Sequence, residues 1–198
     1  MGRASGGMGS RQVNRTLSPR RIAVLVDWVD GDAAMRGRAL LESHWRRRGA
    51  EVWSAGLAPL RSKGSWRGAT PFAPSPAAGE IAGLVASITY ARIRPSKMAH
   101  LYLLRFPGAA RRITRPGSPM LAGIGFSDVP IHHACTFSVW PSSTELDRTV
   151  LGRSEPHGAV VRRSDERRWL SESLFARFHV IDHSGTWGIG DPLDRAQP

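Results

Sequence analysis

The fold of this chain is decided by the stretch IHHACTFSVW, residues 131–140. Apolar and polar residues alternate along it, and side chains two residues apart lie on the same face of a strand. The alternation therefore predicts a strand with one largely apolar face, made by His133, Cys135, Phe137 and Val139. The adjacent His132 falls on the other face, so only one of these two histidines can face the core.

The segments around this strand predict how the sheet is built. Six elements follow from the pattern of apolar residues: 80–93 (strand), 95–112 (helix), 121–126 (strand), 131–140 (strand), 142–151 with 155–170 (helix) and 174–182 (strand). This order is typical of a ferredoxin-like fold, in which two helices cover one face of an antiparallel sheet. We therefore expect a complete α+β unit over residues 80–193.

Tryptophans recur in the same order in both halves of the chain, which indicates an internal duplication. In the first half they mark a strand 22–28 ending in Trp28, a helix 30–49 with Trp45, a strand 51–57, and the turn Gly64-Ser65-Trp66. The corresponding features of the second half are Trp140, Trp169, the run 175–181 and Gly185-Thr186-Trp187. The chain is therefore expected to contain two related units packed together.

The two copies are unequal, because about sixty residues of the second half have no counterpart in the first. Residues 22–58 are thus predicted to form a partial first repeat, and residues 80–193 a complete second one. The Pro-, Gly- and Ser-rich segment 59–79 is interpreted as a linker. Residues 1–21 are rich in Gly, Ser and Arg, and we expect a disordered basic tail.

Composition limits the functional classes. The formal charge is +12, but the basic residues are scattered and match no nucleic-acid-binding module, which argues against nucleic acid as a partner. The single Cys135 excludes an internal disulfide and a cysteine-based zinc site. No apolar run reaches the ~18 residues that span a bilayer. We expect a cytoplasmic protein. Peripheral contact with a membrane and assembly into a homo-oligomer both stay open as alternatives.

Several short motifs of the chain, considered together, resemble the spheroidene monooxygenase family. In the second half they are Thr136–Pro141, Glu155-Pro156-His157, Trp169–Phe178, Gly185–Gly188 and Asp191-Pro192-Leu193. In the first half and the middle they are Gly64–Gly68, Pro71–Pro74, Ile93-Arg94-Pro95 and Gly123-Ile124-Gly125. They keep the family's order and cover most of residues 22–193.

The resemblance implies a haem-dependent monooxygenase that places oxygen on an acyclic carotenoid or another hydrophobic small molecule. It implies tandem ferredoxin-like repeats of the dimeric α+β barrel type, with the first repeat incomplete. Haem iron is implied as cofactor, together with an external electron donor. A redox centre is also required on chemical grounds, since no amino-acid side chain activates O2 for insertion into an unactivated carbon.

The chain departs from the family pattern in three places. Relatives begin with a strand-helix-strand segment that has no counterpart here. The family usually has Thr-Arg-Ala where this chain has Thr89-Tyr90-Ala91, and Trp at the position of Leu103.

The same resemblance implies the site residues. His157, at the start of the last helix of the second repeat, is the expected axial ligand of the haem iron, and His133 is the expected catalytic residue or alternative ligand. Arg92 and Arg177 are expected to pair with haem propionates. A thiolate ligand at Cys135 is disfavoured, and the run Asp182-His183-Ser184 is not taken as a hydrolase triad, because neighbours in sequence do not form one by adjacency.

Two other classes of function remain open at this stage. The chain could be a cofactor-free α+β barrel protein that binds a hydrophobic ligand in an apolar pocket. It could also be an inactive remnant that depends on oligomer formation, since an uncovered sheet face or edge favours association.

Overall fold

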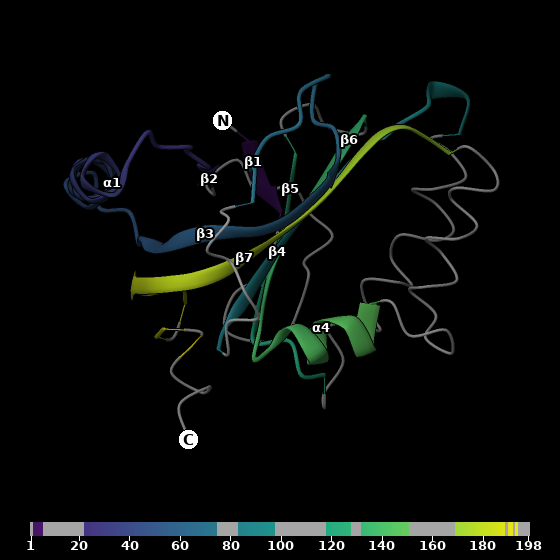
Figure 1. Cartoon of the computed structure of the whole chain (residues 1–198). Coiled ribbons are helices and arrows are strands. Elements are labelled where there is room, and N and C mark those ends of the chain that lie inside the picture. The colour runs from purple at the N-terminus through teal and green to yellow at the C-terminus, as the bar shows by residue number, and fades with distance from the viewer. Residues whose placement is uncertain are drawn as a thin grey trace.

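A computed structural model describes residues 2–5, 22–74, 83–97, 118–127, 132–150, 169–188, 190, 191 and 193. They form one seven-stranded sheet of order β2-β1-β5-β6-β4-β7-β3, in which every neighbouring pair is antiparallel (Figure 1). The strands are β1 (Gly2–Ser5), β2 (Ile22–Ala23), β3 (Trp53–Gly64), β4 (Val85–Ile93), β5 (Ala122–Ser127), β6 (His133–Trp140) and β7 (Leu170–Gly185). The helices are α1 (Gly31–Arg46), the 3-10 turn η1 (Pro95–Lys97) and α4 (Ser143–Val150). None of the helices in these ranges is long and apolar enough to cross a membrane.

The second half of the chain confirms the α+β class and the strands expected for it. Strands β4 to β7 lie in the order β5-β6-β4-β7, which is the order that a ferredoxin-like unit requires. The start of the second helix predicted there is observed as α4, whereas most of residues 95–112 and 155–170 lie outside the described residues. Strand β7 begins at Leu170, so the predicted end of the preceding helix at that residue is wrong.

The alternation predicted for β6 is confirmed by burial. Cys135 and Val139 are buried in the main hydrophobic core, beside Tyr90 of β4 and Leu174 of β7. His133 is 9% exposed on the same face, whereas His132 is exposed to solvent. Only one of the two histidines therefore faces the core, as the pattern indicated.

The opposite face of the sheet is covered in part by α4. Leu146 of this helix is 2% exposed and packs in a second cluster with Val85, Met120 and Trp140. Arg177 on this face of β7 donates to Asp147 of α4, with a distance of 3.0 Å from Nη1 to Oδ2. The helix is thus fixed by both apolar packing and an ion pair.

The first half does not build a separate sheet in the described residues. Strand β3 joins the sheet of the second half by pairing with β7 from Trp53↔Gly185 to Gly64↔Leu174. A linker starting at residue 59 is therefore wrong, because β3 continues to Gly64. Pro59 is tolerated because β3 is an edge strand, and the register shifts directly after it. Tandem ferredoxin-like repeats are not established by this arrangement.

The N-terminal predictions are only partly correct. Of the strand expected at 22–28, only Ile22–Ala23 forms a strand. It pairs with β1, which lies in the segment predicted to be disordered, so that prediction is wrong for residues 2–5.

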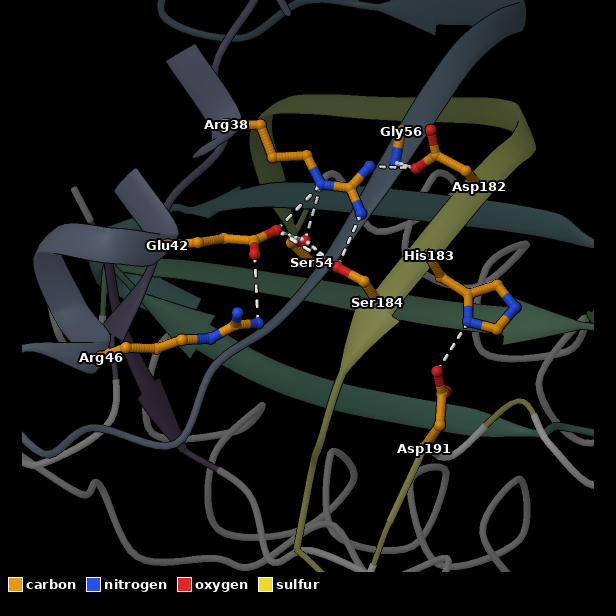
Figure 2. A network of polar contacts seen from close by, with 9 residues as sticks. All are labelled: Arg38, Glu42, Arg46, Ser54, Gly56, Asp182, His183, Ser184 and Asp191. Atoms are coloured by element: carbon orange, nitrogen blue, oxygen red, sulfur yellow. Dashed lines mark hydrogen bonds and ion pairs between the residues drawn. The ribbon is translucent and has the colours of Figure 1, made fainter. Parts of the chain in front are cut away.

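The predicted helix at 30–49 is confirmed as α1. The Asp30 carboxylate accepts from the Ala33 amide at 2.7 Å, the expected N-cap bond. The helix ends at Arg46, three residues earlier than predicted, and Gly49, where φ is +71°, lies in the turn that follows. No residue of α1 is fully buried. The helix is instead attached by polar side chains to β3 and β7 (Figure 2).

Candidate functional site

The turn that follows β3 encloses a carboxylate of β7. Because Gly64 pairs with Leu174, residues 65–68 lie beside Glu172. Oε1 of Glu172 accepts from Ser65 Oγ at 2.9 Å and from the Gly68 amide at 2.7 Å. Glu172 is thus bound by a backbone turn far from it in sequence.

These hydrogen bonds keep Glu172 ionised. Donation from the Gly68 amide is the largest influence and lowers the pKa of the carboxyl group below its ordinary value of 4.5. Burial acts in the opposite direction, but Ser65, the Arg67 amide and the charge of Arg92 lower it further. A carboxylate that accepts backbone amides is stabilised in its charged form. Glu172 is therefore a fixed negative charge at neutral pH.

A buried phenol lies next to this carboxylate. Tyr90 is fully buried, and its ring stacks on Trp66 at 5.0 Å between centroids and 11° between planes. The His133 ring meets it edge to face at 5.4 Å. Tyr90 Oη donates to Glu172 Oε2 at 3.5 Å, a long bond. We refer to Trp66, Tyr90, Arg92, His133 and Glu172 as the Tyr90 cluster.

The structure brings together two of the four site residues predicted from the sequence. Arg92 and His133 are cross-strand partners on β4 and β6, so their side chains start from the same face of the sheet. Arg177 lies on the opposite face, paired with Asp147. His157 lies outside the described residues. Helix α4 covers the opposite face of the sheet from His133. The side chain of His133 therefore does not face the space between α4 and the sheet.

The turn after β7 repeats the arrangement of the turn after β3. Gly64 and Gly185 both have positive φ, +101° and +92°. The amides after them donate to the neighbouring strand segment, Ser65 to Ser173 at 2.8 Å and Thr186 to Val52 at 3.1 Å. The Gly188 amide donates to Glu51 at 2.7 Å, as the Gly68 amide does to Glu172. The duplicated turn motif of the sequence is therefore also duplicated in structure.

A second polar group lies around the paired ends of β3 and β7 (Figure 2). Its α1 side joins Arg38 and Glu42 to Ser54 and Ser184. On the other side of β7, His183 Nδ1 lies 2.7 Å from Asp191 Oδ2. Asp182 and Ser184 both accept from Arg38, whereas His183 contacts Asp191, so these three residues form no triad, as expected.

The described residues include imidazoles, the kind of side chain that ligates a haem iron. No group of three or more His, Cys, Asp or Glu side chains in the described ranges could hold a metal. A haem brings four nitrogen ligands of its own and needs only one axial side chain such as an imidazole. The imidazoles of His133 and His183 are side chains of this type.

Comparison with known proteins gives the family. No family model matches the chain. A spheroidene monooxygenase of Rubrivivax gelatinosus is 32% identical over 182 residues, which are 92% of this chain and 67% of that protein. The chain belongs to the spheroidene monooxygenase family. The enzyme of Rhodobacter capsulatus is 33% identical over 150 residues, and that of Cereibacter sphaeroides 28% identical over 176.

Each match covers a larger share of this chain than of the relative. The match to the Rhodobacter capsulatus enzyme covers 75% of this chain but only 61% of that protein. The match to the Cereibacter sphaeroides enzyme covers 88% of this chain but only 53% of that protein. A solved structure from Fusobacterium nucleatum aligns with a TM-score of 0.42 and 12% identity over 69% of this chain and 55% of its own, which is too weak to carry an argument.

Two motifs that resemble the spheroidene monooxygenase family meet in the Tyr90 cluster. The motif Gly64–Gly68 supplies the turn and Trp66, while the motif Trp169–Phe178 supplies Glu172. Sequence reasoning missed Glu172 as a site residue. A signal was present, because Glu51 and Glu172 each stand at the start of a strand whose neighbour ends in the repeated Gly-Ser/Thr-Trp turn.

Proposed function

We propose that this chain is a haem-dependent monooxygenase acting on a hydrophobic small molecule, with an acyclic carotenoid such as spheroidene as the first candidate. The observation that carries the proposal is the 32% identity with the Rubrivivax gelatinosus enzyme over 92% of this chain. The names of all three relatives support the reaction class.

The chemistry divides between cofactor and protein. Haem, when bound, supplies the activation of O2. The protein holds the cofactor and controls protons near the substrate. His157 remains the ligand that family resemblance proposes, and the imidazoles of the described residues are its alternatives.

The Tyr90 cluster is proposed to control protons and charge. Glu172 holds its negative charge beside the Tyr90 hydroxyl, which orients that group as a donor. His133 is buried against the same ring and can exchange a proton without contact with bulk solvent. Arg92 is exposed next to this group and is the proposed partner of an anionic group such as a propionate.

Labelled oxygen tests the reaction directly. The purified chain is incubated with haemin, a reductant, detergent-dispersed spheroidene and 18O2, and the product is analysed by mass spectrometry. We expect a product that contains one atom of 18O. Carotenoid that is bound but recovered unchanged, by a protein that has taken up haem, would instead identify a ligand-binding protein.

Adjacent histidines provide the matched variants for this assay. His133→Ala removes the buried imidazole and should lower the turnover rate by about 100-fold, the usual size of a lost proton-transfer group. His132→Ala removes the exposed neighbour and should leave the rate unchanged. Circular dichroism of both variants checks that the sheet is intact. Equal rates for the two variants would remove His133 from the reaction.

A further inference from the structure

The five described histidines differ in what holds their rings. His44 is half-buried on α1 beside Arg48, and His132 is exposed directly before β6. His133 is buried against Tyr90. His179 has a buried Nδ1 atom for which no partner is seen in the described part of the chain. The ring of His183 is paired with the carboxylate of Asp191.

The carboxylate that holds His183 is itself firmly placed. Asp191 Oδ1 accepts from Trp53 Nε1 at 3.2 Å and from the Leu193 amide at 2.9 Å, and its Oδ2 faces His183 Nδ1 at 2.7 Å. Burial opposes the charge of Asp191, but these hydrogen bonds outweigh it and lower the pKa of the carboxyl group. The His183 ring is therefore fixed by an ionised partner.

This contact leaves the other ring nitrogen available. Figure 2 shows Nε2 of His183 directed away from Asp191, and no hydrogen bond to it is seen within the described ranges. The side chain of His183 is 22% exposed and that of Asp191 13%. Histidines that bind metals almost always donate their second N–H to a carboxylate or carbonyl, which fixes the ring and raises its basicity.

We propose that His183, oriented by Asp191, is the axial ligand of the haem iron, with Nε2 as the donor atom. The proposal rests on the proposed haem-dependent function and names the residue that holds the cofactor. Trp53, which donates to Asp191, contacts Trp187 at 5.4 Å and Phe137 at 6.0 Å between ring centroids, so the carboxylate that orients His183 is anchored to an aromatic cluster. His133 is less suitable, because the residue is only 9% exposed and its ring already packs on Tyr90.

Haemin titration followed by absorption spectroscopy tests this assignment. We expect the wild-type chain to develop a Soret band that shifts with CO after reduction. His183→Gly should lose this band, and free imidazole added to that variant should restore it, which shows that the fold survives the substitution. His44→Ala, on an exposed helix, is the control and should keep the wild-type spectrum.

The outcomes separate the ligand from the function. An unchanged band in His183→Gly, with loss in His157→Ala or His133→Ala, would overturn the assignment to His183 and leave the haem-dependent function standing. A wild-type chain that binds no haemin would overturn both.

Asp191 is a positioning residue in this proposal, and its test uses a different measurement. Asp191→Asn removes the negative charge from the Nδ1 side of the ring, which lowers the basicity of the imidazole. We expect the haem to remain bound, the reduction potential of the iron to rise and the iron–histidine stretching frequency in resonance Raman spectra to fall. If both quantities stay at the wild-type values, Asp191 does not act on the ligand.

Discussion

At the scale of single residues, Glu172 shows how a charge is placed by the backbone. Its carboxylate is bound by a hydroxyl and by amides of one turn, and it is only partly buried. These groups favour the ionised form, so the stabilisation that they provide depends on pH. The contribution is present above the ordinary pKa of 4.5 and is lost as the pH falls through the lower value of the folded state.

Glu172→Gln should lower the free energy of unfolding at pH 7 by about 1 kcal/mol, since charge-assisted hydrogen bonds are lost at a site that solvent partly screens. Urea denaturation of wild type and variant at several pH values measures this difference. It should shrink as the pH falls below 4.5, because the wild-type carboxyl group then becomes protonated.

The matched control is Glu145→Gln. Glu145 pairs with the exposed Arg148 on α4, and its loss should change stability by less than about 0.5 kcal/mol. A Glu172→Gln effect that is equally small, or that does not vary with pH, would contradict the role given to the turn.

At the scale of elements, the turn Gly64–Gly68 depends on two glycines in different ways. Both have positive φ, +101° at Gly64 and +79° at Gly68. A Cβ on Gly64 would overlap the carbonyl oxygen of Ser173, whereas a Cβ on Gly68 would meet nothing within 4 Å. The first glycine is required by close approach of two strands, and the second only by its backbone angle.

Gly64→Ala is therefore expected to destabilise the fold by about 3 kcal/mol or more, and Gly68→Ala by about 1 kcal/mol, the cost of the left-handed conformation alone. Thermal or urea unfolding of the two variants measures the difference. Similar values for both would show that β3 and β7 can separate locally at this point.

The elements also show what could be predicted from the sequence. Alternation was sufficient for β6, where each side chain has a clear face. It failed at 22–28, because a run of apolar residues does not show whether a neighbouring strand is available to pair with. Val24, Leu25 and Val26 accordingly lie outside any strand and are between 38% and 45% exposed.

The site was less accessible to prediction than the strands. His133 and Arg92 could be proposed from their strands and the family resemblance, but the partner of Tyr90 could not. Glu172 comes within reach of Gly68 only through the pairing of β3 with β7, which joins residues 104 positions apart. Local patterns contain no information on that pairing beyond the repeated turn.

At the scale of the whole molecule, β7 unites the two halves of the sequence. It pairs with β3 on one side and β4 on the other, and its residues Leu174, Ala176, Phe178 and Val180 all lie in the main core. We therefore expect residues 53–64 to unfold together with the second half, although the sequence indicated a domain boundary at residue 58.

Leu174→Ala tests this cooperativity, because Leu174 is fully buried at the meeting point of β3, β4 and β7. It should cost about 2–5 kcal/mol, and tryptophan fluorescence and far-ultraviolet circular dichroism should give one coincident transition. Phe175→Ala, on the opposite face and 38% exposed, is the control and should cost less than about 1 kcal/mol. Two separated transitions would instead show that residues 53–64 and the second half of the chain unfold as independent domains.

Helix α1 is attached by charge rather than by apolar packing, and this makes its attachment sensitive to the solvent. Burial opposes the charge of Glu42, but Ser54, Arg38 and Arg46 outweigh it and lower the pKa of the carboxyl group below 4.5. Acidification below that value should therefore release the helix before the sheet unfolds. Hydrogen exchange should show loss of protection in residues 31–46 at a pH where β4 and β7 remain protected, and no such change with pH is expected for Glu42→Gln.

The molecule consequently has two kinds of cohesion. Water-excluding contacts hold the sheet, and concentrated salt leaves them intact or strengthens them. The helix is held by ionic contacts near the surface, which concentrated salt weakens. Ionic strength alone should thus be able to detach one end of this protein while its centre stays folded.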